Sequence, residues 1–485
     1  NERALLPTQK QGWLIMKKLI SILITLSFIL ASCSSDEPED LTDSGESAGS
    51  DSSAADEAPE AFDYGGEDFR IGVNIRDGAL NSIYLVDTES ETAETYNDAL
   101  YARNRNIEEV YNLNIVSVNN TVEAFLTSIM AGSDDYEAFQ LEYLSTNMNR
   151  CISDQMVYDL KTLGVDLSSE WYDHNANSQI ELEGKLYCLF SDMTLGLYDS
   201  SICLAFNKGL MNEYVGEDPY ELVKNGEWTV DKFNEMMTDV TLDLNGDSVM
   251  DSLDQWGSVS GATTANALYI GFGGKFSSVE NGNYVMDIIA KPNADYLDKI
   301  FDVMYNKSNF QITETMRLGG SDTDVWQASS RIFDEGRMLF RSSMIQDVRS
   351  KRAIEEDFGL LPYPKFDISQ DKYYTYPHMS VWQPNAMVIP VTESEPEQVM
   401  RVLDAITYYS SKTTIPAYYD NVLTGKTIRD DDSAEMLDVI FENIVLDFGL
   451  FYNIGEILTL LPNMAKSENR DYISQIETRR NTIQA

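Results

Sequence analysis

Hydrophobic and polar residues follow two different periods along the chain after residue 60. Residues 68–73 alternate between polar and apolar positions, which predicts a strand, and apolar residues in 95–111 recur at helical spacing among charged ones. Residues 112–118 predict the next strand, and 122–130 a further helix. A strand, a helix and a strand of this size predict a βαβ unit, so the folded body is expected to open as an α/β structure.

The same two periods continue toward the C-terminus without an internal repeat. About 425 residues follow residue 60, which is more than one hydrophobic core usually serves, so two lobes are expected. Thr229 is the expected cap of a helix that carries Phe233, Met236 and Val240. Further strands are predicted within 183–190, 201–207, 358–364 and 386–390, a helix turning into a strand at 333–340, a helix at 393–409, and mostly helices after 434.

Residues 16–32 have the three-part layout of a bacterial export signal. Lys17 and Lys18 precede twelve residues without a charge, which are too few to span a bilayer as a helix. The chain then reads Leu-Ala-Ser-Cys, the form of a lipobox, in which the signal is cut before Cys33 and that thiol carries a lipid. We therefore expect a lipoprotein signal peptide; the alternative is a short buried helix that ends in Cys. Residues 1–15 are expected to be an upstream extension without function.

The stretch 33–60 lacks the residues that build a core. After Cys33 it contains ten acidic residues, no Lys or Arg, and almost no large apolar side chain. Such a composition cannot offset the entropy lost on ordering. We expect a lipidated, disordered acidic tether that holds the folded body off the membrane.

Charge and cysteine content narrow the classes of partner. The net charge of −45 argues against nucleic acid and anionic membrane surfaces and favours neutral or cationic ligands; an alternative is that the charge only keeps an extracellular protein soluble. Apart from Cys33 the chain has Cys151, Cys188 and Cys203, none at zinc-ligand spacing. Buried free thiols are expected, with a Cys188–Cys203 bridge as the alternative.

No catalytic motif stands out. The two histidines, His174 and His378, are neither at a zinc spacing nor beside a Gly-x-Ser-x-Gly turn. Counting the many acids does not exclude the paired carboxylates of a glycosidase, but no motif points to a pair. The sequence therefore predicts a protein that is not an enzyme.

Six short motifs follow one another along the chain behind the lipobox. They are NDALYARNR at 97–105, WYDHNAN at 171–177, GKLY at 184–187, NGEWTV at 225–230, FGLLPYPK at 358–365 and PAYYD at 416–420. In this order they resemble extracellular solute-binding proteins of family 1, the carbohydrate-binding lipoproteins of ABC importers in Firmicutes-like bacteria. The likeness covers nearly all of residues 64–460.

This resemblance implies an α/β, two-lobed type II periplasmic-binding-protein fold with a ligand cleft between the lobes. It implies a first lobe of 64–195 plus 385–450 and a second lobe of 196–384 plus 451–485. The implied function is capture of an oligosaccharide and delivery to ABC permease subunits by a monomer on the outer face of the cell membrane, anchored only through lipid. A receptor for peptides or another non-sugar solute, and a secreted glycoside-active enzyme, remain alternatives.

A sugar site needs flat apolar faces for pyranose rings, with carboxylates and amides for the hydroxyls. Two segments that mix aromatic and polar residues supply this combination, and two other aromatic residues are weaker candidates. The expected ligand-binding residues are Trp171, Tyr172, Asp173, Asn175, Trp326, Tyr374, Tyr376, Trp382, Gln383 and Tyr418. Trp228, at a helix start, is expected to serve packing instead.

The stretch 243–254 has the oxygen pattern of an EF-hand-like calcium loop. Ser248 stands where position 6 of such a loop usually has Gly, and the alternative is an acidic surface turn. Related sugar receptors hold a structural calcium in such a loop, so we expect one structural Ca²⁺ on the second lobe, away from the cleft. Its ligands would be Asp243, Asn245, Asp247, the Val249 carbonyl, Asp251 and Asp254.

Overall fold

The computed structural model describes residues 57–75, 83–142, 144–280, 283–289, 293–378, 386–424 and 427–483. The predicted upstream extension, the signal peptide with Cys33, and the tether as far as residue 56 lie outside the described residues. So do Trp382 and Gln383. In the part of the chain that is described, no helix is both long enough and apolar enough to cross a membrane.

The first sheet is built around β1 (Asp68–Val73). This strand runs parallel to β2 (Asn114–Asn119) on one side and to β3 (Ala138–Leu141) on the other. β11 (Ala386–Val388) joins β3 antiparallel, so the strand order is β11-β3-β1-β2. Because α2 (Thr95–Tyr111) lies between β1 and β2 in the chain, the predicted βαβ unit is confirmed.

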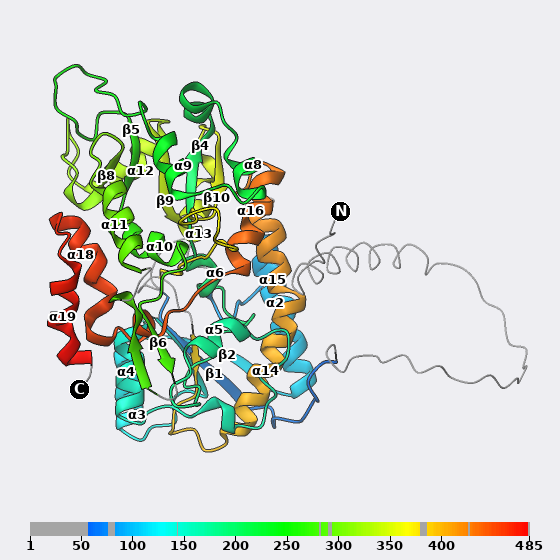
Figure 1. Cartoon of the computed structure of the whole chain (residues 1–485). Helices are drawn as coiled ribbons and strands as arrows, with labels where there is room; N and C mark the ends of the chain where they lie inside the picture. Colours follow the sequence, from blue (N-terminus) through cyan, green and yellow to red (C-terminus); the bar gives the residue numbers. More distant parts are fainter. Residues whose placement is uncertain are drawn as a thin grey trace, which may run out of the picture. The chain divides into compact units, whose positions relative to one another are not determined.

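Four helices supply most of the core around this sheet. They are α2, α3 (Val122–Met130), α4 (Leu144–Ser153) and α14 (Pro396–Lys412), whose buried apolar residues join those of β1 and β3 in one cluster. Figure 1 shows α3 and α4 on one side of β1 and β2, with α2 and α14 on the other. The helical period predicted for 95–111 therefore corresponds to residues buried against the sheet.

The second sheet has the order β10-β4-β9-β5-β8. β5 runs parallel to β9 and β8, while β4 is antiparallel to both β9 and β10. Every residue of β4, β5 and β10 is buried, so these strands are covered on both faces. The bounds are β4 (Ile202–Asn207), β5 (Trp256–Ser260), β8 (Phe310–Ile312), β9 (Met338–Met344) and β10 (Phe358–Leu361).

Helices cover both faces of the second sheet. One core cluster contains residues of α9 (Val230–Met236), α10 (Thr264–Gly271) and α11 (Asn293–Met304), and the other contains residues of α12 (Val325–Asp334) and α13 (Ile345–Ser350). The Thr229 hydroxyl caps α9 by accepting the Lys232 N–H, as expected. Trp228 is fully buried and donates its indole N–H to the Pro362 carbonyl, which confirms its packing role.

α16 (Asp431–Glu442) packs on the second sheet, although residues 385–450 were expected in the first lobe. The reason is a set of polar contacts at its first turn. The Ser433 hydroxyl accepts the Leu360 N–H of β10 at 3.1 Å and lies 2.7 Å from the Tyr220 hydroxyl. A range drawn from sequence order alone does not reveal such contacts.

Residues 183–190 differ from the expected strand. Leu189 makes an isolated pair of hydrogen bonds with Met387 of β11, after a turn in which Glu183 and Gly184 are left-handed. Cys151, Cys188 and Cys203 are free and buried, so the thiol interpretation is confirmed and Cys188 is not bridged to Cys203. Burial raises the pKa of Cys151 to about 12.

The remaining elements are short or lie near the C-terminus. A two-stranded hairpin is formed by β6 (Ser277–Glu280) and β7 (Asn283–Met286). The other α-helices are α5 (His174–Gln179), α6 (Gly196–Ser200), α7 (Lys208–Leu210), α8 (Pro219–Lys224), α15 (Thr414–Pro416), α17 (Phe448–Phe451), α18 (Leu460–Ser467) and α19 (Tyr472–Ile483). Single-turn 3₁₀ or π segments are η3 (Leu160–Thr162), η4 (Met211–Val215), η5 (Asp287–Ile289), η6 (Thr313–Thr315), η7 (Lys351–Ala353), η8 (Ala417–Thr424) and η9 (Ile454–Thr459).

Candidate functional site

The carboxyl edges of the two sheets are joined by a short length of chain. Ile202, at the start of β4, pairs with Met344 at the end of β9 and donates its N–H to the Tyr376 carbonyl. Ala386, at the start of β11, pairs with Leu141 at the end of β3. Ten residues of chain reach at most about 35 Å, so these edges lie near one another. Ligands of open α/β sheets bind outside such edges, which makes this region the candidate site.

Three chain segments run side by side where the chain passes between the sheets. Thr375 donates its N–H to the Asn443 carbonyl and accepts from Val445, both at 2.9 Å. On the other side of this segment, His378 donates its N–H to the Ser200 carbonyl at 2.8 Å. These hydrogen bonds involve only a few residues of each segment between the two sheets. Such segments are where backbone angles absorb a hinge motion.

Trp326 provides an exposed aromatic surface at the carboxyl edge of the second sheet. Its side chain stands in the first turn of α12 and is 51% exposed. The indole lies over Gly261, directly after β5, where an added Cβ would come within 2.9 Å of a ring atom. Glycine is therefore what allows the ring to rest on the backbone. The outer face of the indole is available for the C–H surface of a sugar ring.

Two polar groups lie near Gly261, on which this indole rests. The Glu314 carboxylate, after β8, is half-buried and accepts the Ala262 N–H at 3.0 Å. The Thr263 hydroxyl also lies close to the Gly261 Cβ position. A carboxylate and a hydroxyl next to a flat apolar face are the groups that recognise sugar hydroxyls.

The carboxyl edge of the first sheet carries amides and a carboxylate. Asn74, after β1, donates from its side-chain nitrogen to Glu142 Oε1 at 2.7 Å, and Asn147 donates to the Glu142 carbonyl at 2.8 Å. Glu142, after β3, is only 6% exposed. The two edges thus present complementary chemistry, aromatic on one side and amide-rich on the other.

An internal cavity between the first sheet, α2 and α14 is too small for a sugar. Its volume is about 20 Å³, and Gln140 and Arg103 are among its lining residues. That volume holds about one water molecule. Burial lowers the pKa of Arg103 to about 10, while Val86 and Ser410 accept its N–H groups. The cavity is part of the packed interior and not a ligand site.

Tyr418, an expected ligand residue, belongs to a buried ion-pair cluster instead. Its hydroxyl donates to Asp199, a fully buried residue of α6. Arg349 binds both oxygens of the same carboxylate, at 3.0 and 2.5 Å, and the Tyr84 hydroxyl donates to it at 2.5 Å. The pKa of Tyr418 is held well above its usual range, first by burial and then by Asp199. The cluster joins segments that follow strands of both sheets.

The aromatic segment that begins at Trp171 is also buried. Trp171 is 7% exposed and donates its indole N–H to Asp404 Oδ1 at 2.8 Å, and the Tyr172 hydroxyl donates to the same oxygen. Asp173 caps α5 by accepting the Ala176 N–H, and the exposed Asn175 donates to the Ile444 carbonyl. Trp171 and Tyr172 thus belong to the first core, whereas Asp173 is half-buried and Asn175 is exposed.

Only part of the second predicted aromatic segment lies within the described residues. Tyr376 is 5% exposed and packs in the core of the second sheet, and Tyr374 lies against Gly273. Trp382 and Gln383 are outside the described residues. Among the predicted aromatic residues that are described, Tyr374 is partly exposed and Trp326 is the most exposed, at 51%.

The 243–254 loop has a left-handed residue at position 6 but not a gathered set of carboxylates. Ser248, at position 6, has φ +68°, the left-handed conformation for which such loops normally use Gly. Asp243 accepts the N–H groups of Gly246 and Ser248, and both Asp254 oxygens accept backbone N–H groups. Among the described residues, no three of the loop's aspartates bring oxygens within 4.8 Å of one another.

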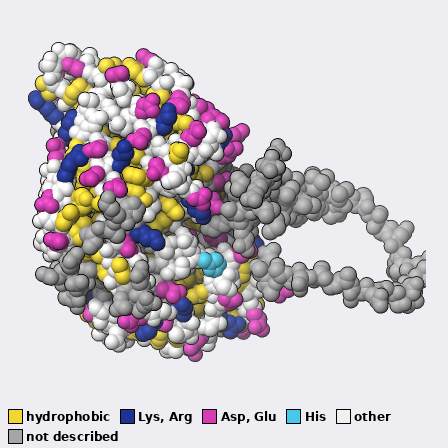
Figure 2. Space-filling model, viewed as in Figure 1, with side chains coloured by type: hydrophobic (Ala, Val, Ile, Leu, Met, Phe, Trp, Pro, Cys, Tyr) yellow, Lys and Arg dark blue, Asp and Glu magenta, His cyan; other side chains and the backbone are white. Residues whose placement is uncertain are grey.

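Three other acidic side chains do lie close together, and the guanidinium of Arg70 already binds two of these residues. Oxygens of Asp134, Glu137 and Glu393 lie within 4.8 Å of one another. Arg70 donates to both Glu137 oxygens and to the Asp134 carbonyl. Elsewhere, Figure 2 shows acidic side chains spread over the visible face with basic ones between them. The negative charge of the chain is thus not concentrated into one patch on that face.

Comparison with known proteins identifies the fold. No protein-family model matches the chain, and no curated protein matches it. Solved structures do match. A cyclo/maltodextrin-binding protein complexed with maltotetraose is 11% identical, with a TM-score of 0.55, over 86% of this chain and 97% of that one. The chain has the two-lobed fold of periplasmic binding proteins.

Two further solved structures match the same share of this chain. The apo form of RafE from Streptococcus pneumoniae is 13% identical, with a TM-score of 0.53, covering 86% of this chain and 97% of that chain. An ABC substrate-binding protein from Listeria monocytogenes in complex with cycloalternan is 12% identical, with a TM-score of 0.51, covering 86% and 98%. The predicted fold class is confirmed by these matches, and at such identities they establish the fold alone.

Sequence reasoning missed several residues of the candidate site. Gly261, Glu314, Asn74 and Glu142 carry no local motif, and what unites them is their place directly after strands. Glu314 and Glu142 follow the short apolar runs of β8 and β3, so a search for polar residues at strand ends would have found them.

Proposed function

We propose that this protein is the substrate-binding component of an ABC importer and captures an oligosaccharide between the carboxyl edges of its two sheets. Three structural neighbours support the ligand class, since their descriptions name maltotetraose, raffinose and maltotriose as bound sugars. Closing two lobes on a ligand converts binding into a shape that a permease recognises.

The observation that carries this proposal is the exposed Trp326 indole resting on Gly261 beside Glu314. It lies where this class of fold binds ligands. A flat apolar face with an adjacent carboxylate suits a pyranose ring better than an extended peptide, whose main chain is usually recognised by a strand edge or groove. Of the alternatives, this arrangement favours the sugar receptor.

A thermal-shift screen tests the ligand class. Maltotriose, maltotetraose, raffinose and short neutral peptides are compared at equal concentrations, followed by calorimetry on any hit. A ligand at a hundred times its dissociation constant raises the free energy of unfolding by about 2.7 kcal/mol. We expect one or more oligosaccharides to shift the melting curve without being hydrolysed. A shift with peptides alone, or turnover of a sugar by pure protein, would reject the proposal.

Trp326→Ala locates the site within the same screen. The variant should lose about tenfold in sugar affinity, or about 1.4 kcal/mol, because the stacking face is gone. Ile368→Ala is the matched control, since Ile368 is 76% exposed and lies in the loop after Lys365. Equal affinities for the two variants would place the ligand elsewhere.

We further propose that the protein is exported, cut before Cys33, and held at the outer face of the membrane by lipid, where it works as a monomer with permease subunits. The apolar run and the Leu-Ala-Ser-Cys sequence support this. Radiolabelled palmitate should appear on the protein expressed from its gene in a Gram-positive host and be absent from Cys33→Ala. Label on the variant, or none on either, contradicts the anchor.

A structural calcium ion in the 243–254 loop is a separate proposal. The left-handed turns at Gly246 and Ser248 and the spacing of its oxygens support it, and the ligand oxygens would have to converge when the ion binds. Titration of Ca²⁺ into chelator-treated protein should release or absorb heat and raise the melting temperature, with both effects lost in Asp243→Asn. No heat and an unchanged melting temperature would rule it out.

A further inference from the structure

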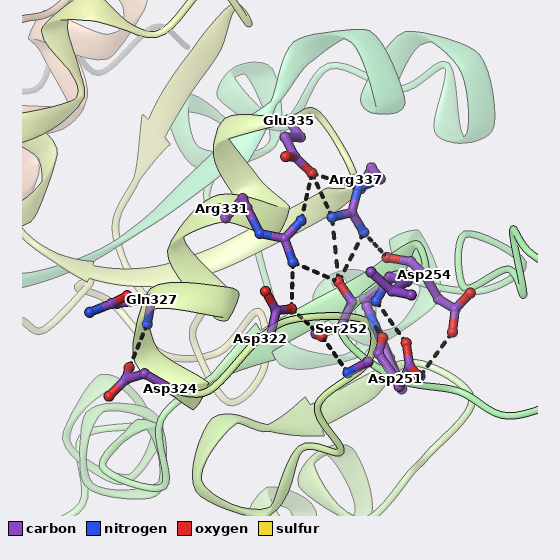
Figure 3. A network of polar contacts seen from close by, with 12 residues as sticks. Asp251, Ser252, Asp254, Asp322, Asp324, Gln327, Arg331, Glu335 and Arg337 are labelled. Carbon is purple, nitrogen blue, oxygen red and sulfur yellow. Dashed lines mark hydrogen bonds and ion pairs between the residues drawn. The ribbon is translucent and has the colours of Figure 1, made fainter.

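Ser252 lies at the centre of a polar network that fastens α12 to the loop before β5 (Figure 3). The Ser252 side chain is fully buried, and its hydroxyl donates to Asp322 Oδ2 at 2.5 Å while accepting the Gly319 N–H at 2.9 Å. A guanidinium nitrogen of Arg331 donates to the same Asp322 oxygen at 2.6 Å. The Asp322 carboxylate therefore accepts from a hydroxyl and binds a cation at once. Its pKa lies below the usual value, chiefly because the Ser252 hydroxyl donates a hydrogen bond to it.

The turn between α12 and β9 is tied to the same loop. Arg337 donates to the Asp254 carbonyl at 2.6 Å and to the Ser252 carbonyl at 3.3 Å. Arg331 and Arg337 also share the Glu335 carboxylate, at 3.0 and 2.6 Å. The side chains of Asp322 and Arg337 are 18% and 16% exposed, while their partners Arg331 and Glu335 are 34% and 47% exposed. One member of each ion pair is therefore largely shielded from solvent.

Trp326 stands between these two attachments. Asp322 precedes it by four residues and Arg331 follows it by five, and both are fastened to Ser252. In the same stretch, Asp324 caps the helix by accepting the Gln327 N–H at 2.8 Å, as Figure 3 shows. The indole itself is half exposed and rests on Gly261. Its position is thus determined by where the first turn of α12 is held.

We propose that Asp322 and Arg331 are positioning residues for the ligand platform: by tying α12 to Ser252 on both sides of Trp326, they hold the indole over Gly261. Neither residue needs to touch a ligand. The sugar-binding consequence rests on the proposed function, whereas the placement of the indole does not. A binding group that is displaced by about 1 Å loses much of its effect, so weakening these ties lowers affinity through Trp326.

Two substitutions test the network, and the first of them also keeps the side-chain volume. Asp322→Asn keeps an oxygen for Ser252 and removes the charge that Arg331 binds, and Arg331→Gln removes the guanidinium. The matched control is Asp231→Asn, which breaks the exposed ion pair with Lys299 in the same lobe. Melting curves accompany every variant, and Arg331→Lys, which keeps the charge but loses the two-pronged geometry, should be intermediate.

The first measurement needs no ligand. The quenching of fluorescence by acrylamide is measured for each protein with Trp326 present and again with Trp326→Phe added. The difference between the two signals is the contribution of Trp326. Asp322→Asn and Arg331→Gln should raise the quenching constant about twofold, because the first turn of α12 opens more often, while Asp231→Asn should leave it unchanged. An unchanged quenching constant in both network variants overturns the proposal, whatever happens to the melting temperature.

The second measurement is a double-mutant cycle on the dissociation constant of maltotriose, or of raffinose if that sugar gives the larger thermal shift. Asp322→Asn should raise the dissociation constant about fivefold with Trp326 present and leave it unchanged in a Trp326→Ala background. An equal loss in both backgrounds means that Asp322 does not act through Trp326 and overturns the proposal. If quenching responds but neither sugar binds wild-type protein, the positioning role stands and the proposed ligand class fails.

Discussion

Two tryptophans with similar sequence surroundings have opposite environments. Trp171 is followed by Tyr, Asp, His and Asn, and Trp326 by Gln, Ala and Ser. The first is 7% exposed with its indole N–H on Asp404, and the second is 51% exposed over Gly261. The difference comes from their neighbours in space: a helix supplies the half-buried acceptor Asp404 to one, and a glycine supplies a flat backbone to the other. Polar flanks therefore do not identify an exposed aromatic platform.

The largest expected effect is on the buried side of this comparison. Trp171→Ala should lower the free energy of unfolding by about 3–5 kcal/mol, because it leaves a cavity beside Tyr408 and removes a donor from Asp404. Urea denaturation measures this loss. Trp326→Ala is the control and should cost less than about 1 kcal/mol, since its side chain is half exposed. Equal losses would mean that the two environments do not differ.

Asp404 is the next test, and its effect depends on pH. Burial raises its pKa above the usual value, while hydrogen bonds from Tyr172 and Trp171 act in the opposite direction. A folded-state pKa above the unfolded value means that the group stabilises the protein most below the unfolded pKa and loses that contribution as pH rises through the folded pKa. Asp404→Asn should cost about 1–3 kcal/mol at low pH, with a smaller cost at neutral pH.

The Asp404 measurement compares wild type and Asp404→Asn in urea at pH 3.5 and pH 7. Only the difference between the two proteins is interpreted, because other carboxylates titrate over the same range. Glu314→Gln serves as the control, since Glu314 is half-buried and accepts a single backbone N–H group. A cost of Asp404→Asn that grows with pH would show that the ionised carboxylate is the favoured form in the folded protein.

Replacing each tryptophan with Phe separates stability from ligand binding. Trp326→Phe keeps a flat face, so sugar affinity should fall by less than about threefold with an unchanged melting temperature. Trp171→Phe leaves affinity unchanged but removes the N–H donor, at a cost of about 1–2 kcal/mol in the free energy of unfolding. Calorimetry and urea denaturation on both variants measure the two quantities. If Trp171→Phe lowered sugar affinity and Trp326→Phe lowered stability, the roles assigned to the two residues would have to be exchanged.

A small effect on stability is also expected at Gly261. The added methyl group of Gly261→Ala would lie 2.9 Å from the Trp326 ring, so the indole must shift outward. Because that ring is exposed, the cost in stability should stay below about 1 kcal/mol, while sugar affinity drops about threefold. Gly209→Ala is the control, because Gly209 does not have a left-handed φ. Gly320→Ala is unsuitable, because the φ of +59° at Gly320 would strain an alanine. An unchanged affinity would show that the ring does not need this seat.

The motifs that carry the family resemblance mark the interior more than the ligand site. Trp228, Arg103 and Tyr418 come from three of these motifs, and all are buried with a hydrogen-bond partner. They hold the second core, the α2 interface and the ion-pair cluster around Asp199. This is why the motifs predicted the fold correctly but pointed to ligand residues such as Tyr418 that the structure buries.

Local pattern was sufficient for most of the secondary structure. The alternation at 68–73 and the helical period at 95–111 appear as β1 and α2 at the same residues, and Thr229 is the cap that its position before an apolar helix predicts. These features depend on neighbours a few residues away, which the sequence contains directly. The βαβ unit and the α/β class follow from their order.

The candidate site could not be obtained in the same way, because its members are distant in sequence. Gly261 and Trp326 meet only because β5 ends where α12 begins, and Ser252, Asp322 and Arg331 meet because a loop before β5 packs under that helix. The amino-acid sequence by itself determined the periods, the caps and the class of fold. The tertiary structure decided which tryptophan is exposed, because exposure depends on which distant side chains cover a ring.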